Sequence, residues 1–109
     1  MDNTITFDDF KKLDIRIGTI IVAEEVPDAD KLIRLEVDFG EFKRQIMAGI
    51  REWFPDPSVL VGKQVPILVN LEPKKLRGYE SQGMMLAADE NAPILLNPEK
   101  PVTPGTIVR

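Results

Sequence analysis

Residues 14–26 read DIRIGTIIVAEEV and contain the pattern that determines the fold. Apolar and polar residues alternate up to Gly18, as in a β-strand with one buried face, and the apolar phase then shifts to Ile20 and Val22. A phase shift at a glycine is typical of a bulge or a sharp strand bend. A long first strand that bends and contributes to two faces indicates a small closed barrel.

The chain downstream supplies partners for this strand. Further strands are predicted at residues 33–39, 42–48, 63–70 and 82–88. The first of these alternates apolar and charged side chains with a period of two, and Gly40-Glu41 after it fits a type II′ hairpin turn. Pro66 predicts an edge position or a bulge in the fourth strand, because proline cannot donate to a sheet hydrogen bond.

A short helical turn is predicted at residues 49–54, between strands three and four, where prolines follow. Five strands, this turn and the bent first strand together indicate an all-β protein with a five-stranded OB-like barrel. An SH3-like barrel also has five strands, but it usually lacks the element between strands three and four. Trp53 and Phe54 in the turn are expected to plug the barrel.

The two ends of the chain are expected to add to a single domain of residues 1–109. Thr6 and Asp9 form an imperfect capping box for a short N-terminal helix, which we expect to cover the core as a lid. Residues 88–109 form a C-terminal β extension, with short strands at 94–96 and 106–108.

Composition excludes several classes of function. The chain has no cysteine and no histidine, which removes disulfides, thiolate or imidazole metal sites, and the usual neutral-pH general base. We expect no catalytic residue, no metal and no cofactor, and we rank an enzyme that uses paired acids last. No apolar run approaches the roughly 18 residues needed to cross a bilayer, and no signal-peptide pattern opens the chain, so we expect a cytoplasmic protein with no membrane contact.

Charge is distributed unevenly along the chain. The overall net charge is −4, yet residues 43–85 carry a net charge of +3 while residues 1–42 carry −6 and residues 86–109 carry −1. An acidic body with one basic stretch fits a localised contact with a polyanion. Chance asymmetry in a short chain explains the distribution almost equally well.

The segment from Asn70 to Met85 concentrates groups that suit RNA. Lys75 and Arg77 are two residues apart, so an extended backbone would point both side chains the same way, toward phosphate oxygens. Asn70, Ser81 and Gln82 add neutral donors and acceptors suited to 2′-hydroxyls, phosphates or unpaired base edges. From chemistry alone, a solvated basic loop over residues 71–81 remains the simpler interpretation.

Four stretches of the chain, taken together, carry a resemblance to a known family. They are residues 14–20 (DIRIGTI), 26–32 (VPDADKL), 44–50 (RQIMAGI) and 70–88. In this order they resemble the tRNA-binding domain found at the C-terminus of bacterial and archaeal methionyl-tRNA synthetases, in free-standing structure-specific tRNA-binding proteins, and in eukaryotic synthetase-associated cofactors.

The resemblance implies an OB-fold whose C-terminal extension forms a homodimer, and binding to the outer corner of tRNA by shape rather than sequence. It places the RNA-binding residues at Asn70, Lys75, Arg77, Ser81, Gln82 and Met84, to which Lys31 and Lys74 are reasonable additions. The implied function is a non-catalytic module that improves tRNA capture by methionyl-tRNA synthetase, whose catalytic part is a possible partner.

Two physical features agree with recognition of RNA shape. Tyr79 is the sole aromatic residue in the segment, so base-by-base stacking would be limited. Three or four phosphate contacts per chain would give modest, salt-sensitive affinity, which a dimer could raise by avidity. The alternative function is a dimeric peptide-binding export chaperone of the same fold family, with Met84, Met85 and Leu86 lining an apolar groove. The pattern of residues 28–32 and 81–88 resembles the synthetase branch instead.

Overall fold

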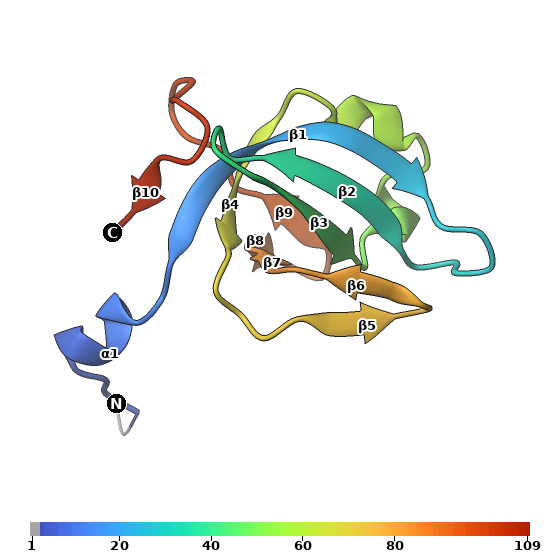
Figure 1. Ribbon diagram of the computed structural model, residues 1–109. Coiled ribbons are helices and arrows are strands. Elements are labelled where there is room, and N and C mark those ends of the chain that lie inside the picture. The colour runs from blue at the N-terminus through green and yellow to red at the C-terminus, as the bar shows by residue number, and fades with distance from the viewer. Residues whose placement is uncertain (1–2) are drawn as a thin grey trace.

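The computed structural model describes residues 3–109, and a long bent strand organises it (Figure 1). This strand, β1 (Ile15–Glu25), pairs with β4 (Gln64–Leu68) through its first half and with β2 (Ile33–Asp38) through its second half. Thr19 pairs with both neighbours. The bend is confirmed, but the register shift falls between Ile20 and Val22 rather than at Gly18. At Gly18 the side chains of Val37 and Phe39 instead pack directly against the backbone and leave no room for a Cβ atom.

Antiparallel neighbours complete the barrel. The remaining strands are β3 (Lys43–Ala48), β5 (Lys74–Leu76), β6 (Tyr79–Ser81), β7 (Met84–Met85), β8 (Ala87–Asp89), β9 (Pro93–Leu95) and β10 (Ile107–Val108). The main sheet has the order β3-β2-β1-β4-β7, and β10 pairs with β1. The segment that joins β6 to β7 returns to β3, where the Gln82 amide donates to the Gln45 carbonyl at 2.8 Å. The barrel is therefore nearly closed, and the predicted all-β, OB-like fold is confirmed.

The core lies inside this barrel and follows the predicted alternation. In β2, Ile33, Leu35 and Val37 are fully buried while the residues between them are partly exposed. Two 3-10 turns stand between β3 and β4: η1 (Arg51–Trp53) is the predicted turn, whereas η2 (Pro57–Leu60) was not predicted. It begins at Pro57, because proline is compatible with a first helical position, and its Leu60 is fully buried.

The two aromatic residues at the first turn, Trp53 and Phe54, lie in different environments. Phe54 packs against the core, but Trp53 is 44% exposed, so the prediction that both plug the barrel is wrong for Trp53. The physical reason is the tight turn: η1 ends at Trp53, and the non-helical residue after it, Phe54, is the one that packs against the core.

The N-terminal helix α1 (Phe7–Lys11) forms with its predicted cap but does not cover the core. The Asp9 amide donates to the Thr6 hydroxyl at 3.1 Å, and the Thr6 amide donates to the Asp9 carboxylate at 3.5 Å. No residue of the helix is buried, Phe7 is 71% exposed, and the helix extends away from the barrel (Figure 1). The prediction of a lid is wrong, because the strands and η2 already fill the core.

Pro66 is not at a sheet edge, since β4 lies between β1 and β7. Its carbonyl accepts a hydrogen bond from the Leu86 amide at 3.0 Å, at the residue where β7 and β8 are interrupted. Pro66 has no backbone N–H to donate, and it lies opposite Leu86, where the neighbouring strand is broken. The two short strands predicted in the extension form as β9 and β10, but the single strand predicted at residues 82–88 is wrong, because it is broken into β7 and β8. β8 forms a hairpin with β9, and β10 pairs with β1.

Candidate nucleic-acid interface

The segment predicted as an exposed loop is largely a β-hairpin made by β5 and β6. Its two-residue turn, Arg77-Gly78, has φ values of +53° and +84°, as in a type I′ turn. Arg77 is thus outside the extended strand, so the extended backbone assumed for Lys75 and Arg77 is wrong, although both residues line the same depression. An Arg-Gly pair between two short alternating runs was the available signal for this hairpin.

An apolar face holds the hairpin against the barrel. Leu76 and Tyr79, on opposite strands of the hairpin, pack against a small second core of Val26, Ala29 and Met47. Tyr79 is half-buried in this contact. Its ring therefore anchors the hairpin, and little of it remains for stacking on a base.

Polar bonds fix the hairpin further. The Ser81 hydroxyl accepts from the Met47 amide and donates to the Gly83 carbonyl, both at 3.0 Å, and Ser81 is buried. The Gln82 side-chain oxygen accepts from the Gln45 amide at 3.0 Å, while the Gln45 side chain donates to the Glu80 carbonyl at 2.8 Å. The structure therefore places two predicted RNA ligands, Ser81 and Gln82, in internal hydrogen bonds.

Asn70 is also engaged within the chain. Its side-chain oxygen accepts from the Asp14 amide at 2.8 Å, and its side-chain nitrogen donates to the Lys12 carbonyl at 2.6 Å. These bonds join the chain beyond β4 to the start of β1. The three neutral residues predicted from sequence thus shape the surface on which the cations stand.

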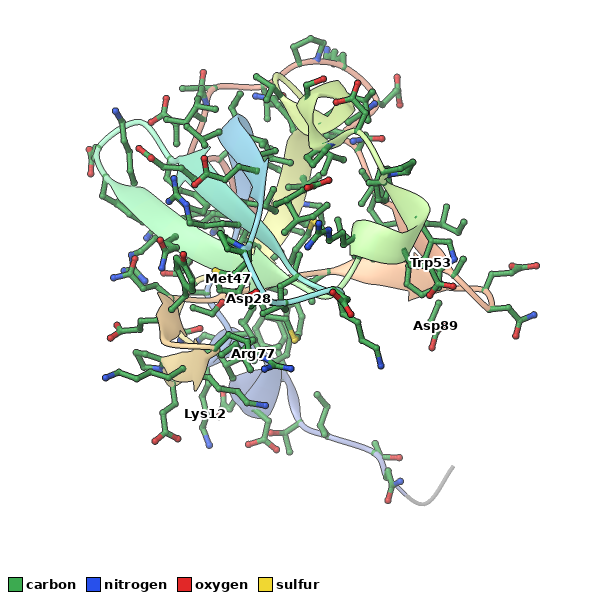
Figure 2. The ribbon with its side chains drawn as sticks, turned by 90° about the vertical axis from the view of Figure 1, so that its right-hand side faces the viewer. Lys12, Asp28, Met47, Trp53, Arg77 and Asp89 are labelled. Atoms are coloured by element: carbon green, nitrogen blue, oxygen red, sulfur yellow. The ribbon has the colours of Figure 1, made fainter. Side chains whose placement is uncertain are left out.

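The four predicted cations are placed differently. Within residues 3–109, no ion pair or side-chain hydrogen bond engages Lys31, Lys74, Lys75 or Arg77. Lys31 comes from the turn between β1 and β2, and it lines a surface depression of about 460 Å³ with Lys75 and Arg77. Asp28 and Asp30 share this depression, and Figure 2 shows Asp28 beside Arg77 at the hairpin end of the barrel.

Lys74 and Met84 stand apart from that depression. Lys74 is exposed on the neighbouring strand position of the hairpin. Met84 is 44% exposed but faces a separate pocket that β7 shares with Trp53. The structure therefore brings together three of the eight predicted site residues, places Lys74 next to them and places Met84 elsewhere.

Supporting residues of this surface were missed by sequence reasoning. Arg44 donates from one nitrogen to the Val69 and Gln82 carbonyls, both at 3.1 Å, and so joins β3 to both ends of the hairpin segment. Arg51 donates to the Val26 and Ala29 carbonyls and to Glu25. Two cations of the basic stretch are thus structural, and no local pattern distinguishes them from exposed ones.

Two further features of residues 3–109 bear on function. No cluster of three or more His, Cys, Asp or Glu side chains is placed to hold a metal ion there. Over the same described residues, no helix has the length and apolar character required to cross a membrane.

Comparison with known proteins places this surface in context. Residues 15–107 match the family model described as "Putative tRNA binding domain". The methionine–tRNA ligase of Methanococcoides burtonii is 56% identical over 108 residues, which cover 95% of this chain and 16% of the ligase. The chain thus spans about one-sixth of the length of such relatives.

Solved structures agree with this match. A MetRS-related protein from Pyrococcus horikoshii superposes with a TM-score of 0.92 at 37% identity, covering 98% of this chain and 99% of its own. The chaperone CsaA from Bacillus anthracis superposes with a TM-score of 0.86, also at 37% identity, covering 97% and 99%. The chain belongs to the tRNA-binding domain family, which is a non-catalytic accessory domain of methionyl-tRNA synthetases.

Proposed function

We propose that this chain captures tRNA by its shape and backbone and so raises the tRNA affinity of a methionyl-tRNA synthetase, in the cytoplasm where tRNA is charged. The observation that carries the proposal is the convergence of Lys31, Lys75 and Arg77 on one depression, without partners within residues 3–109. Such cations suit phosphate oxygens, which fix position without reading sequence. The internally bonded hairpin supports recognition by a preformed surface, because little ordering would be needed on binding.

The proposal is tested by measuring the affinity of the chain for unmodified tRNA over a salt series. We expect log affinity to fall linearly with log salt, with a slope of about −3, because about four cations contact phosphates and each contributes roughly 0.7–0.9 to the slope. An unstructured RNA of equal length and a tRNA of another specificity serve as controls. Shape recognition requires the two tRNAs to bind with similar affinity and the unstructured RNA to bind more weakly. Equal affinity for all three RNAs would contradict it.

We also propose that a second copy of the chain covers the face formed by α1 and the C-terminal extension. Phe7, Leu13, Ile107 and Val108 are all exposed, and they line one groove of about 530 Å³. The strand β10 pairs with β1 alone among the described strands, so one edge of it is open for pairing. Two copies related by a twofold axis would bury the same apolar face on each.

Light scattering on wild type and a Phe7→Glu/Ile107→Glu variant tests the dimer. We expect wild type to have twice the chain mass and the variant to dissociate at least about ten-thousandfold more readily. Each such side chain contributes about 1.5–3 kcal/mol when buried, and a twofold dimer contains both of them twice. A Val59→Glu/Val61→Glu variant is the matched control, because those residues are also exposed and apolar but belong to the η2 region. A monomeric wild type, or dissociation of the control alone, would contradict the proposed face.

A second candidate function is peptide binding, which the superposition on the chaperone CsaA favours. Met84 and Met85 do line a pocket, whereas Leu86 is not part of its lining. Binding of unfolded peptides in the absence of tRNA binding at low salt would support this alternative.

A further inference from the structure

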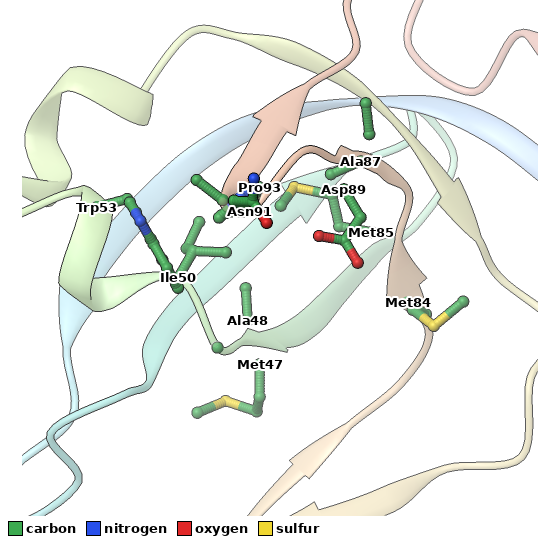
Figure 3. A pocket seen from close by; sticks show the side chains of 13 residues that line it. Met47, Ala48, Ile50, Trp53, Met84, Met85, Ala87, Asp89, Asn91 and Pro93 are labelled. Atoms are coloured by element: carbon green, nitrogen blue, oxygen red, sulfur yellow. The ribbon is translucent and has the colours of Figure 1, made fainter.

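A second pocket, distinct from the cation-lined depression, opens on the side of the barrel where β7, β8 and β9 meet the end of β3. It has a volume of about 510 Å³, within the range of small-molecule sites. Its walls come from η1, from the end of β3 and from the β8–β9 hairpin, and Met84 lines it at the edge furthest from Trp53 (Figure 3). Its lining is mostly apolar, and nothing in the tRNA-binding surface described above uses it.

Trp53 gives this pocket an exposed aromatic wall. Its side chain is 44% exposed although it is the largest apolar residue in the chain, while Phe54 beside it is packed into the core. Figure 3 shows the indole at one side of the pocket, across from Pro93 and Asn91. A flat aromatic ligand could stack there, and base stacking on OB-folds is worth about 1–3 kcal/mol per base.

Asp89 gives the pocket a specific polar group. Of the described residues that line it, Asp89 alone is charged, and it is exposed at the mouth of the pocket beside Met85 (Figure 3). No side-chain hydrogen bond or ion pair within residues 3–109 occupies this carboxylate. An ionised carboxylate is an acceptor only, with two oxygens able to receive two parallel donors.

Guanine is the base whose chemistry matches this pocket. Its Watson–Crick edge presents two adjacent donors, N1–H and the N2 amino group, whereas adenine, cytosine and uracil each present one donor beside acceptors. The neighbouring carboxylates of Glu52 and Glu90 would repel phosphate, so a base could enter while its backbone stayed outside. Unpaired bases that stack on aromatic residues and bond through this edge are the usual targets of sequence-reading RNA proteins.

We propose that this pocket accepts an unpaired guanine of the bound RNA, stacked on Trp53 and hydrogen-bonded to Asp89. The inference rests on the proposed function, because β6 of the cation-bearing hairpin leads directly into β7 at the pocket wall. One RNA could therefore reach the cations and the pocket together. Shape and phosphates would then provide most of the affinity, and one base would fix the register of the RNA.

The Asp89→Asn variant tests the assignment by the sign of its effect. Removing a negative charge near a polyanion raises affinity if the carboxylate makes no contact, but losing a paired donor–acceptor contact lowers it. We expect tRNA affinity to fall about tenfold, since a bidentate base contact contributes roughly 1–3 kcal/mol of discrimination. The Glu90→Gln variant, on the same hairpin, removes the same charge outside the pocket lining and is expected to bind tRNA as well as wild type or better.

Trp53 is the sole tryptophan of the chain, so its fluorescence reports directly on the pocket. We expect saturating tRNA to quench it in wild type and much less in Asp89→Asn. An unquenched Trp53, or a variant that binds tRNA as tightly as wild type, would overturn the proposal. Quenching by GMP, together with unchanged tRNA affinity in Asp89→Asn, would also overturn it and would indicate a site for a free nucleotide. Quenching by an apolar peptide but not by tRNA would overturn it as well.

The two proposals fail in different ways. If wild type does not bind tRNA, both are wrong. If wild type binds tRNA and replacement of Lys75 and Arg77 weakens binding, but Asp89→Asn does not, then only the guanine assignment is wrong. Comparable thermal stability of Asp89→Asn and Glu90→Gln would show that lost affinity does not arise from unfolding.

Discussion

The Lys75→Ala/Arg77→Ala variant is expected to bind tRNA at least about tenfold more weakly than wild type, with a salt dependence whose slope is shallower by about 2. Both side chains line the depression at the end of the hairpin and lack partners within residues 3–109, so their removal costs little folding energy. Two lost charge-assisted contacts amount to about 1–2 kcal/mol or more. Each lost phosphate contact also removes about one unit from the salt slope. Fluorescence anisotropy with labelled tRNA at several salt concentrations measures both effects.

A matched control removes the same charge elsewhere. Lys63 and Lys100 line a pocket with Thr19 and Gln64, and neither of them lines the depression that Lys75 and Arg77 share. The Lys63→Ala/Lys100→Ala variant has the same net charge as the test variant and is expected to lose less than about threefold in affinity through the long-range field. Equal loss in both variants would show that overall charge, and not the hairpin surface, governs binding.

How far the sequence determines this structure depends on the range of the interactions involved. The strand that contains Ile33, Leu35 and Val37 was predictable, because the alternation of apolar and polar residues along the chain directly gives its buried face. The capping box at Thr6 was predictable for the same reason. Where the helix would lie was not, since that depends on whether the barrel core is already filled.

The candidate site shows the same division. The identity of its cations is readable from the basic stretch, but the partners of its neutral residues are not. Ser81 bonds 34 residues back to Met47, and Asn70 bonds 58 residues back to Lys12. No local pattern indicates such contacts. A polar residue that binds RNA and a polar residue that bonds within the chain therefore cannot be distinguished in the sequence. The same limit explains Trp53, whose orientation in η1 depends on which aromatic residue the core accepts.

Gly83 stands at the junction of the hairpin and the barrel, where an added methyl group would meet the backbone of β4. It has a φ of +147°, and a Cβ atom there would lie 2.8 Å from the Leu68 carbonyl oxygen and 3.2–3.3 Å from the side chains of Ile46 and Ile67. A carbonyl of β4 cannot move without disturbing the sheet, so Gly83→Ala would push the β6–β7 junction off the barrel. We expect a loss of about 3 kcal/mol in unfolding free energy, from overpacking of about 1–3 kcal/mol and backbone strain of about 1 kcal/mol or more. Urea denaturation measures it.

Gly78→Ala separates the steric contribution from the backbone strain. Gly78 has a φ of +84°, but a Cβ atom there would meet nothing within 4 Å. Its replacement should therefore cost about 1 kcal/mol, the price of an unfavourable φ alone. We further expect Gly83→Ala to weaken tRNA binding more than Gly78→Ala, although Gly78 is nearer to Arg77, because displacement of the junction breaks the Ser81 and Gln82 bonds that fix the hairpin on β3. If both alanine variants lost equal stability, close packing at Gly83 would not be what holds the hairpin against the barrel.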